Sequence, residues 1–162
     1  MQRRLVIHAV VLGAFFFNAQ ALLNPSKSYA QESACRLQIA KAGQSISSLG
    51  AVVSDVVVGV NESPRNPFPG KESITFRVGS LSATKDAAKK SADLMNSPGI
   101  QTRIAKQLIA ACPDVAEVRF NMTATDWDSS FFRGEDDSVI KGTCVDPGRG
   151  NDWPLWGFYA CL

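Results

Sequence analysis

The N-terminal segment has the pattern of a secretory signal peptide, and this pattern constrains the rest of the chain more than any other feature. A short basic start at Arg3 and Arg4 is followed by a mostly apolar run over residues 5–17. Small residues then offer two cleavage sites, after Ala21 and after Ala30. A basic start, an apolar run and a small-residue cleavage site together are typical of an exported protein.

Cleavage after Ala30 is favoured, because the earlier site would leave the apolar pair Leu22-Leu23 on the new N-terminus. We therefore expect residues 1–30 to be the signal peptide and residues 31–162 to form a single globular domain in the periplasm or outside the cell. An uncleaved membrane anchor is the alternative. The apolar run is shorter than the roughly 20 residues that a span needs, so no stable membrane span is expected after cleavage.

Removal of this segment changes the charge and the chemistry of what remains. The whole chain has 17 basic and 15 acidic residues; residues 1–30 hold three of the basic ones and no acid, which leaves 14 against 15. A near-neutral balance does not favour a nucleic-acid partner. The single histidine, His8, also lies in the signal peptide. The mature domain is therefore expected to lack histidine-dependent catalysis and histidine-ligated metals, and no cofactor is expected.

All four cysteines lie in the mature domain, and in an exported chain an even number indicates disulfides. They are Cys35, Cys112, Cys144 and Cys161. Three connectivities are open. If residues 138–145 and 155–162 form a hairpin, Cys144 and Cys161 lie about five residues apart along it, which exceeds disulfide reach. This separation disfavours the Cys144–Cys161 pair and favours a bond from Cys112 to one of these strands.

The hydrophobic pattern predicts an α+β fold. Strands are expected at residues 51–60, 73–79, 115–122, 138–145 and 155–162. Helices are expected over residues 82–95 and from Ser97-Pro98 to residue 112, with the Ser97 side chain accepting a backbone N–H at the N-cap. Residues 33–48 and 125–137 stay unassigned. This order predicts a disulfide-stapled α+β domain in which an antiparallel sheet carries a helical pair on one face.

An acidic cluster follows the predicted strand at residues 115–122, and it suggests three interpretations. Its members are Asp126, Asp128, Glu135, Asp136 and Asp137. Several carboxylates can bind calcium, although the spacing differs from that of an EF-hand loop. Two carboxylates can also serve a small hydrolase. The third interpretation is an ordinary solvated loop, and no catalytic residue is assigned.

The C-terminus is rich in aromatic residues and allows two interpretations. Trp153, Trp156 and Tyr159 could form a binding surface for a sugar, a peptide or a protein partner. The simpler interpretation is that the last strand packs its aromatic side chains beneath the helices, since a helix-covered sheet needs large apolar residues.

The C-terminal half also resembles a known group of sequences. The resemblance rests on the helix start at Ser97-Pro98, the run over residues 111–118, Cys144, and the closing residues 156–161. These segments are similar to those of small exported proteins of unknown function found in cyanobacteria. The resemblance implies a bacterial periplasmic or secreted protein and carries no activity and no site residues with it.

These observations together predict a non-enzymatic exported domain that binds an unidentified protein or envelope partner. Two alternatives remain open at this point. One is a small hydrolase that uses the acidic residues between Asp126 and Asp137, and the other is a module stabilised by calcium.

Overall fold

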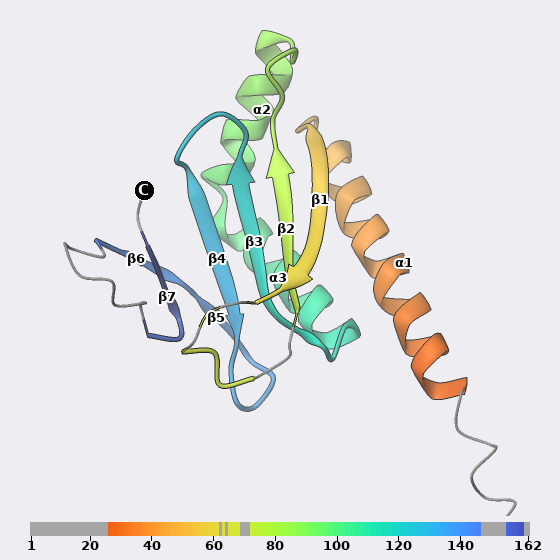
Figure 1. Ribbon diagram of the computed structural model, residues 1–162. Helices are drawn as coiled ribbons and strands as arrows, with labels where there is room; N and C mark the ends of the chain where they lie inside the picture. The colour runs from red at the N-terminus through yellow and green to blue at the C-terminus, as the bar shows by residue number, and fades with distance from the viewer. Residues whose placement is uncertain (1–25, 62, 64, 69–71, 147–154, 161–162) are drawn as a thin grey trace, which may run out of the picture.

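The computed structural model describes residues 26–61, 63, 65–68, 72–146 and 155–160. Within these residues, three helices accompany a five-stranded sheet and a small two-stranded sheet (Figure 1). The predicted α+β class is therefore confirmed. None of the helices in the described ranges is long and apolar enough to cross a membrane.

The elements follow one another in a simple order. They are α1 (Ser26–Ser48), β1 (Val53–Val60), β2 (Glu72–Val78), α2 (Lys85–Met95), α3 (Pro98–Ala111), β3 (Val115–Met122), β4 (Asp128–Arg133), β5 (Val139–Lys141), β6 (Thr143–Val145) and β7 (Phe158–Ala160). The five-stranded sheet has the order β1-β2-β3-β4-β5, and β6 pairs with β7.

The large sheet is antiparallel except between β2 and β3, which run parallel. The reason is the connection: α2 and α3 lie between these two strands in the chain and carry it back across one face of the sheet. A crossover of this kind brings the chain to the starting edge again, so the next strand runs in the same direction. Figure 1 shows α2 and α3 behind the sheet.

The core lies between the helices and the face of the sheet that they cover, called here the inner face. Phe76 of β2 and Phe120 of β3 stack with ring centroids 5.5 Å apart, and Phe131 of β4 meets Phe120 edge-on at 5.9 Å. All three rings are fully buried, and Ile104 and Leu108 of α3 are buried with them. Burial of such side chains supplies most of the stability of a domain of this size.

Helix α1 covers residues that the sequence pattern leaves unassigned. Cys35, Ile39, Ala42 and Ile46 recur at helical spacing and face the core, where Ala42 and Ile46 are buried. The rest of the helix is mostly small or polar, so its apolar stripe is narrow. The helix packs against α3 and borders the β1 side of the sheet (Figure 1).

The two central helices begin close to the predicted positions, but their caps differ. Thr84 caps α2 by accepting a hydrogen bond from the Ala87 N–H at 3.3 Å. Pro98 opens α3 as predicted. The predicted Ser97 side-chain cap is wrong: its hydroxyl donates to the Asp93 carbonyl at 2.6 Å instead. The α2–α3 connection is so short that Ser97 still reaches the last turn of α2.

One disulfide joins α1 to the end of α3. Cys35 and Cys112 are bonded, with their Cα atoms 4.9 Å apart. The preference for a bond between Cys112 and a C-terminal strand is therefore wrong, because α1 folds as a helix against α3 and brings Cys35 to this position. Cys144 is also disulfide-bonded, and Cys161 lies outside the described residues.

The predicted C-terminal hairpin is wrong as well. The strands β6 and β7 are parallel, with Cys144 opposite Tyr159. A turn lies directly before β7, in which the Phe158 N–H donates to the Leu155 carbonyl at 2.9 Å. The expected separation of Cys144 and Cys161 depends on antiparallel pairing, so it does not apply.

Candidate functional site

The outer face of the sheet, away from the helices, carries a row of polar side chains. Ser73 of β2 lies opposite Glu117 of β3, and Glu117 lies opposite Phe132 of β4. Arg119 follows two residues after Glu117, so it projects from the same face. These four neighbouring side chains form a floor.

A C-terminal segment, residues 155–160, forms a wall above this floor. The Trp156 ring packs against Phe132 with centroids 4.8 Å apart, and its indole N–H donates to the Arg133 carbonyl at 3.0 Å. The Tyr159 hydroxyl donates to the Asp128 carbonyl at 3.0 Å. The expectation that the last strand packs beneath the helices is therefore wrong. The inner face is already filled by the core, and Phe132 offers an apolar contact on the outer face.

Floor and wall border a half-open hollow of about 290 Å³, called here the sheet-face pocket. Val60, Asn61 and Ser63, at and after the end of β1, close another side. Two of the three aromatic residues predicted as a binding surface, Trp156 and Tyr159, line it. Trp153 lies outside the described residues.

Glu117 is the central acid of the pocket. It is partly buried, and its carboxylate accepts a hydrogen bond from the Asn61 side-chain amide at 2.8 Å. Burial raises the pKa of Glu117 above its ordinary value, against smaller opposing effects of the Arg119 charge and a Ser130 hydrogen bond. The carboxyl group therefore holds its proton more tightly than an exposed glutamate does.

Arg119 is held beside Glu117 by two partners on β4. Its Nε donates to the Ser130 hydroxyl at 3.3 Å, and its Nη2 lies 3.7 Å from an Asp128 carboxylate oxygen. Burial and the Asp128 charge raise the pKa of Tyr159, so its phenol stays protonated and remains a donor. The pocket thus presents both signs of charge within one row of side chains.

The five acidic residues that were predicted as one cluster form two groups. Asp126 and Asp128 lie at the start of β4, while Glu135, Asp136 and Asp137 lie in the turn after it. A strand advances about 3.4 Å per residue, so the whole of β4 separates the two groups. Among the described residues, no group of three or more His, Cys, Asp or Glu side chains could hold a metal ion.

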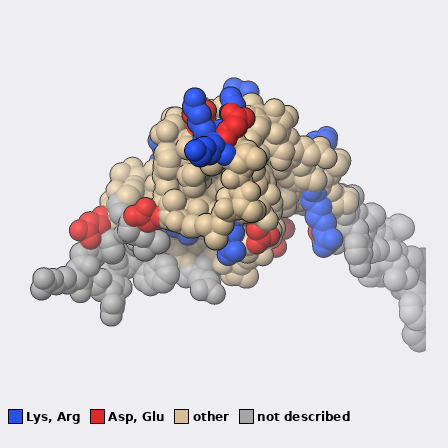
Figure 2. All heavy atoms as spheres, turned by 90° about the horizontal axis from the view of Figure 1, so that it is seen from above, with Lys and Arg blue, Asp and Glu red and all other residues tan. Residues whose placement is uncertain are grey.

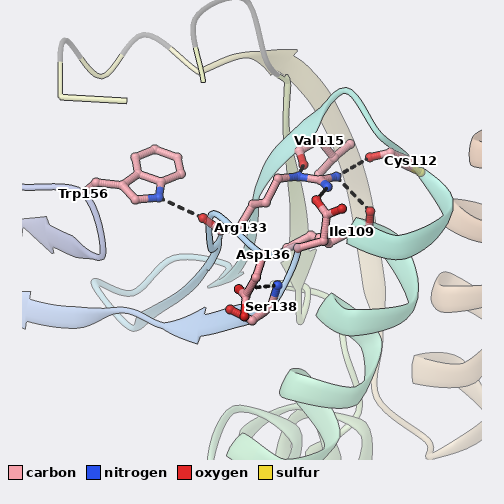
Figure 3. A network of polar contacts seen from close by, with 8 residues as sticks. Ile109, Cys112, Val115, Arg133, Asp136, Ser138 and Trp156 are labelled. Carbon is pink, nitrogen blue, oxygen red and sulfur yellow. Dashed lines mark hydrogen bonds and ion pairs between the residues drawn. The ribbon is translucent and has the colours of Figure 1, made fainter. Parts of the chain in front are cut away.

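The second acidic group has a structural role around Arg133, a buried residue of β4 on the inner face. Its guanidinium donates to the carbonyls of Ile109, Cys112 and Val115 at 2.8–2.9 Å, and it forms an ion pair with Asp137 (Figure 3). Two of these carbonyls lie at the C-terminal end of α3, where backbone acceptors have no helical partner. Arg133 therefore caps this helix and is not free to bind a ligand.

Asp136 supports the same turn. Its carboxylate accepts the Ser138 backbone N–H at 3.1 Å, and hydrogen bonds with Ser138 lower the pKa of Asp136 (Figure 3). The turn residues are thus satisfied by local partners.

A larger cavity, of about 540 Å³, lies between α1 and β1 and is a weaker candidate for a functional site. Figure 1 shows the N-terminal half of α1 diverging from the β1 side of the sheet. The disulfide, Ile39 and Val58 give the gap apolar walls. Of the four charged residues that line it, Glu32 and Arg36 pair with each other at 2.5 Å, and the other two are Glu72 and Asp114. Cleavage after Ala30 would place the new N-terminus directly at this gap.

The charge distribution adds no second candidate on the face that Figure 2 shows. Basic and acidic side chains stand next to one another there, and neither sign gathers into a broad area. Among the described residues, the sheet-face pocket is therefore the feature that combines a concave shape, polar groups and aromatic walls.

Comparison of the chain with protein-family models, with curated proteins and with solved structures finds no match. The geometry of the sheet-face pocket is therefore the main guide to function.

Proposed function

We propose that this chain is an exported, non-enzymatic binding domain and that the sheet-face pocket is its binding site. The observation that carries the proposal is the position of Glu117. Its carboxyl is withdrawn from solvent, held by Asn61 and flanked by Arg119, beneath the aromatic wall of Trp156 and Tyr159. A concave site with aromatic walls and a few placed polar groups is the usual form of a ligand site.

The separation of Asp126 from Glu135 does not support a hydrolase that uses these two residues as its carboxylate pair. Asp126 and Glu135 lie beyond opposite ends of β4. A glycosidase-type carboxylate pair must flank one bond, roughly 5–9.5 Å apart. The same separation weakens the proposal of a calcium-stabilised module, because a calcium ion needs its oxygen ligands around one point.

Export is supported by two independent features. One is the basic and apolar pattern of residues 1–30, and the other is the Cys35–Cys112 disulfide. Disulfides persist in the periplasm and outside cells and are rare in the cytosol.

The proposal is tested by capture of small molecules on the mature chain, residues 31–162. The protein is incubated with the low-molecular-weight fraction of periplasm or culture medium from its source, and retained compounds are identified by mass spectrometry. Ser73→Tyr fills the floor of the pocket, whereas Arg77→Tyr, four residues along the same strand, places the same ring opposite Asn121, which does not line the pocket. We expect a compound retained by wild type and Arg77→Tyr but not by Ser73→Tyr. Equal retention by all three proteins would contradict the proposal.

A further inference from the structure

The chemistry of the sheet-face pocket restricts the kind of ligand that it takes. Glu117 and Arg119 project from the same face of β3, two residues apart, and both line the pocket. Asp128 lies 3.7 Å from the Arg119 guanidinium. An anion in this space would compete with Asp128 for Arg119, and a cation would compete with Arg119 for its acidic neighbours. A neutral ligand leaves this row of opposite charges undisturbed.

The polar groups of the pocket include both donors and acceptors. The Glu117 carboxylate accepts, the Arg119 guanidinium and the Asn61 amide donate, and the Ser63 hydroxyl does both. The Ser73 hydroxyl donates to the Gly59 carbonyl at 3.5 Å, so it is left as an acceptor. A ligand that matches this set must itself offer several groups that donate and accept at short spacing. A ring that carries several hydroxyl groups has this property.

The aromatic wall offers mainly apolar surface, because its polar atoms are already bonded elsewhere. The Trp156 indole N–H is used by the Arg133 carbonyl, and the Tyr159 hydroxyl is used by the Asp128 carbonyl. Phe158, which also lines the pocket, is 41% exposed. The rings are therefore suited to pack against the C–H face of a ligand while the opposite floor bonds its hydroxyls.

The size of the cavity agrees with a ligand of one ring. Its volume of about 290 Å³ lies at the lower end of the range of roughly 300–1,000 Å³ that small-molecule sites occupy.

We propose that the sheet-face pocket binds a neutral saccharide through a single pyranose ring. This inference rests on the proposed function and names the ligand class. One face of the ring packs against Trp156 and Tyr159, and its hydroxyls bond Glu117, Arg119 and Asn61. The ring is either a free monosaccharide or the end unit of a glycan, and both share this chemistry.

The test titrates the mature chain with the methyl glycosides of glucose, galactose, mannose and N-acetylglucosamine and follows backbone amide shifts by NMR. A methylated disaccharide of the strongest binder separates the two sources. Tighter binding of the disaccharide indicates a glycan end, and weaker binding indicates a free monosaccharide. A single ring is expected to bind with a Kd of about 1 mM.

Three variants locate the binding. Ser73→Tyr should abolish it, Glu117→Gln should weaken it roughly tenfold through loss of a charge-assisted hydrogen bond, and Arg77→Tyr should leave it unchanged. Circular dichroism confirms that each variant is folded.

Two charged probes separate failure of this inference from failure of the proposed function. If none of the four glycosides shifts the pocket amides while lysine methyl ester or acetate does so, the saccharide inference is overturned and the pocket remains a binding site. If neither the glycosides nor the charged probes shift these amides, and no compound is captured from the extract, both proposals fail.

Discussion

The side-chain amide of Asn61 lies 2.8 Å from the carboxylate of Glu117, and it joins the end of β1 to the outer face of β3. The two residues are 56 positions apart in the chain. Between them lie β2, α2 and α3, whose crossover makes β2 and β3 parallel and so brings Glu117 next to Ser73. The pocket therefore depends on the crossover as much as on its own side chains.

Burial of Glu117 predicts a specific pH dependence of stability. Its pKa is raised in the folded protein above the ordinary value of 4.5, so the folded state binds the proton more tightly than the unfolded state. This contribution is present at low pH and is lost as the pH rises from 4.5 through the raised value. Glu117→Gln should remove this pH-dependent loss of stability, so the free energy of unfolding measured in urea should change less with pH across this range. Exposed Glu135→Gln is the control; a wild-type slope in Glu117→Gln would contradict the prediction.

The contacts of the Arg133 guanidinium predict that replacing it by an uncharged side chain causes a large loss of stability. Arg133→Met keeps the apolar stem but removes the guanidinium donor from the carbonyls of Ile109, Cys112 and Val115, of which Cys112 keeps the Val115 N–H. Loss of one partner from a buried charged network costs about 3–5 kcal/mol. The exposed Arg103→Met on α3 should change the free energy of unfolding by less than about 0.5 kcal/mol. Comparable losses in the two variants in chemical denaturation would show that Arg133 does not cap α3.

The Cys35–Cys112 bond closes a loop with a sequence separation of 77 residues. Loop-closure entropy for such a length predicts that the double variant Cys35→Ala, Cys112→Ala loses about 4.5 kcal/mol of unfolding free energy. Much of the effect should appear in α1, since the bond anchors this helix to the end of α3. Hydrogen exchange should therefore accelerate in α1 before it does so in β2 and β3. Uniform acceleration in all elements would argue against this anchoring role.

The close surroundings of Gly142, beside the pocket, predict that a side chain at this position would clash. A Cβ atom there would lie 2.6 Å from the Phe132 ring, 2.9 Å from the Ser130 carbonyl oxygen and 3.0 Å from the Tyr159 ring. Gly142→Ala should cost about 1–3 kcal/mol and disturb the packing of Tyr159. Gly43→Ala is the matched control, because a Cβ atom at Gly43 would meet no atom within 4 Å and alanine favours a helix by up to about 1 kcal/mol. In thermal unfolding, the melting temperature should fall in Gly142→Ala and should not fall in Gly43→Ala. An unchanged melting temperature in Gly142→Ala would contradict the close packing.

Much of the fold was predictable from local patterns. The strands β1, β2 and β3 have β-branched or alternating residues, and α3 has a clear apolar stripe. Each of these local patterns predicts the element that the structure has there. Helix α1 was missed because its stripe is narrow. Strand β4 was missed because its inward side chains are Ser129, Phe131 and Arg133, whose partners are distant: Ser129 bonds Gln101 of α3, and Arg133 bonds the end of the same helix.

The candidate site was only partly predictable. The alternation around Glu117 and Arg119 indicated a polar sheet face, and the aromatic C-terminus indicated a possible binding surface. The sequence does not show that the aromatic C-terminal segment covers the polar face of the sheet. This placement depends on contacts between Trp156 and Phe132 and between Tyr159 and Asp128. Such long-range contacts leave no periodic pattern in the sequence.

The central claim is that the sheet-face pocket is the binding site, and backbone amide NMR of the mature chain tests it most directly. The labelled protein is titrated with the low-molecular-weight fraction of periplasm or culture medium from its source. We expect saturable shifts at Ser73, Glu117, Arg119 and Tyr159, and none at Glu32 and Ile39 beside the gap between α1 and β1. Shifts confined to that gap, or no shifts in any element, would contradict the account.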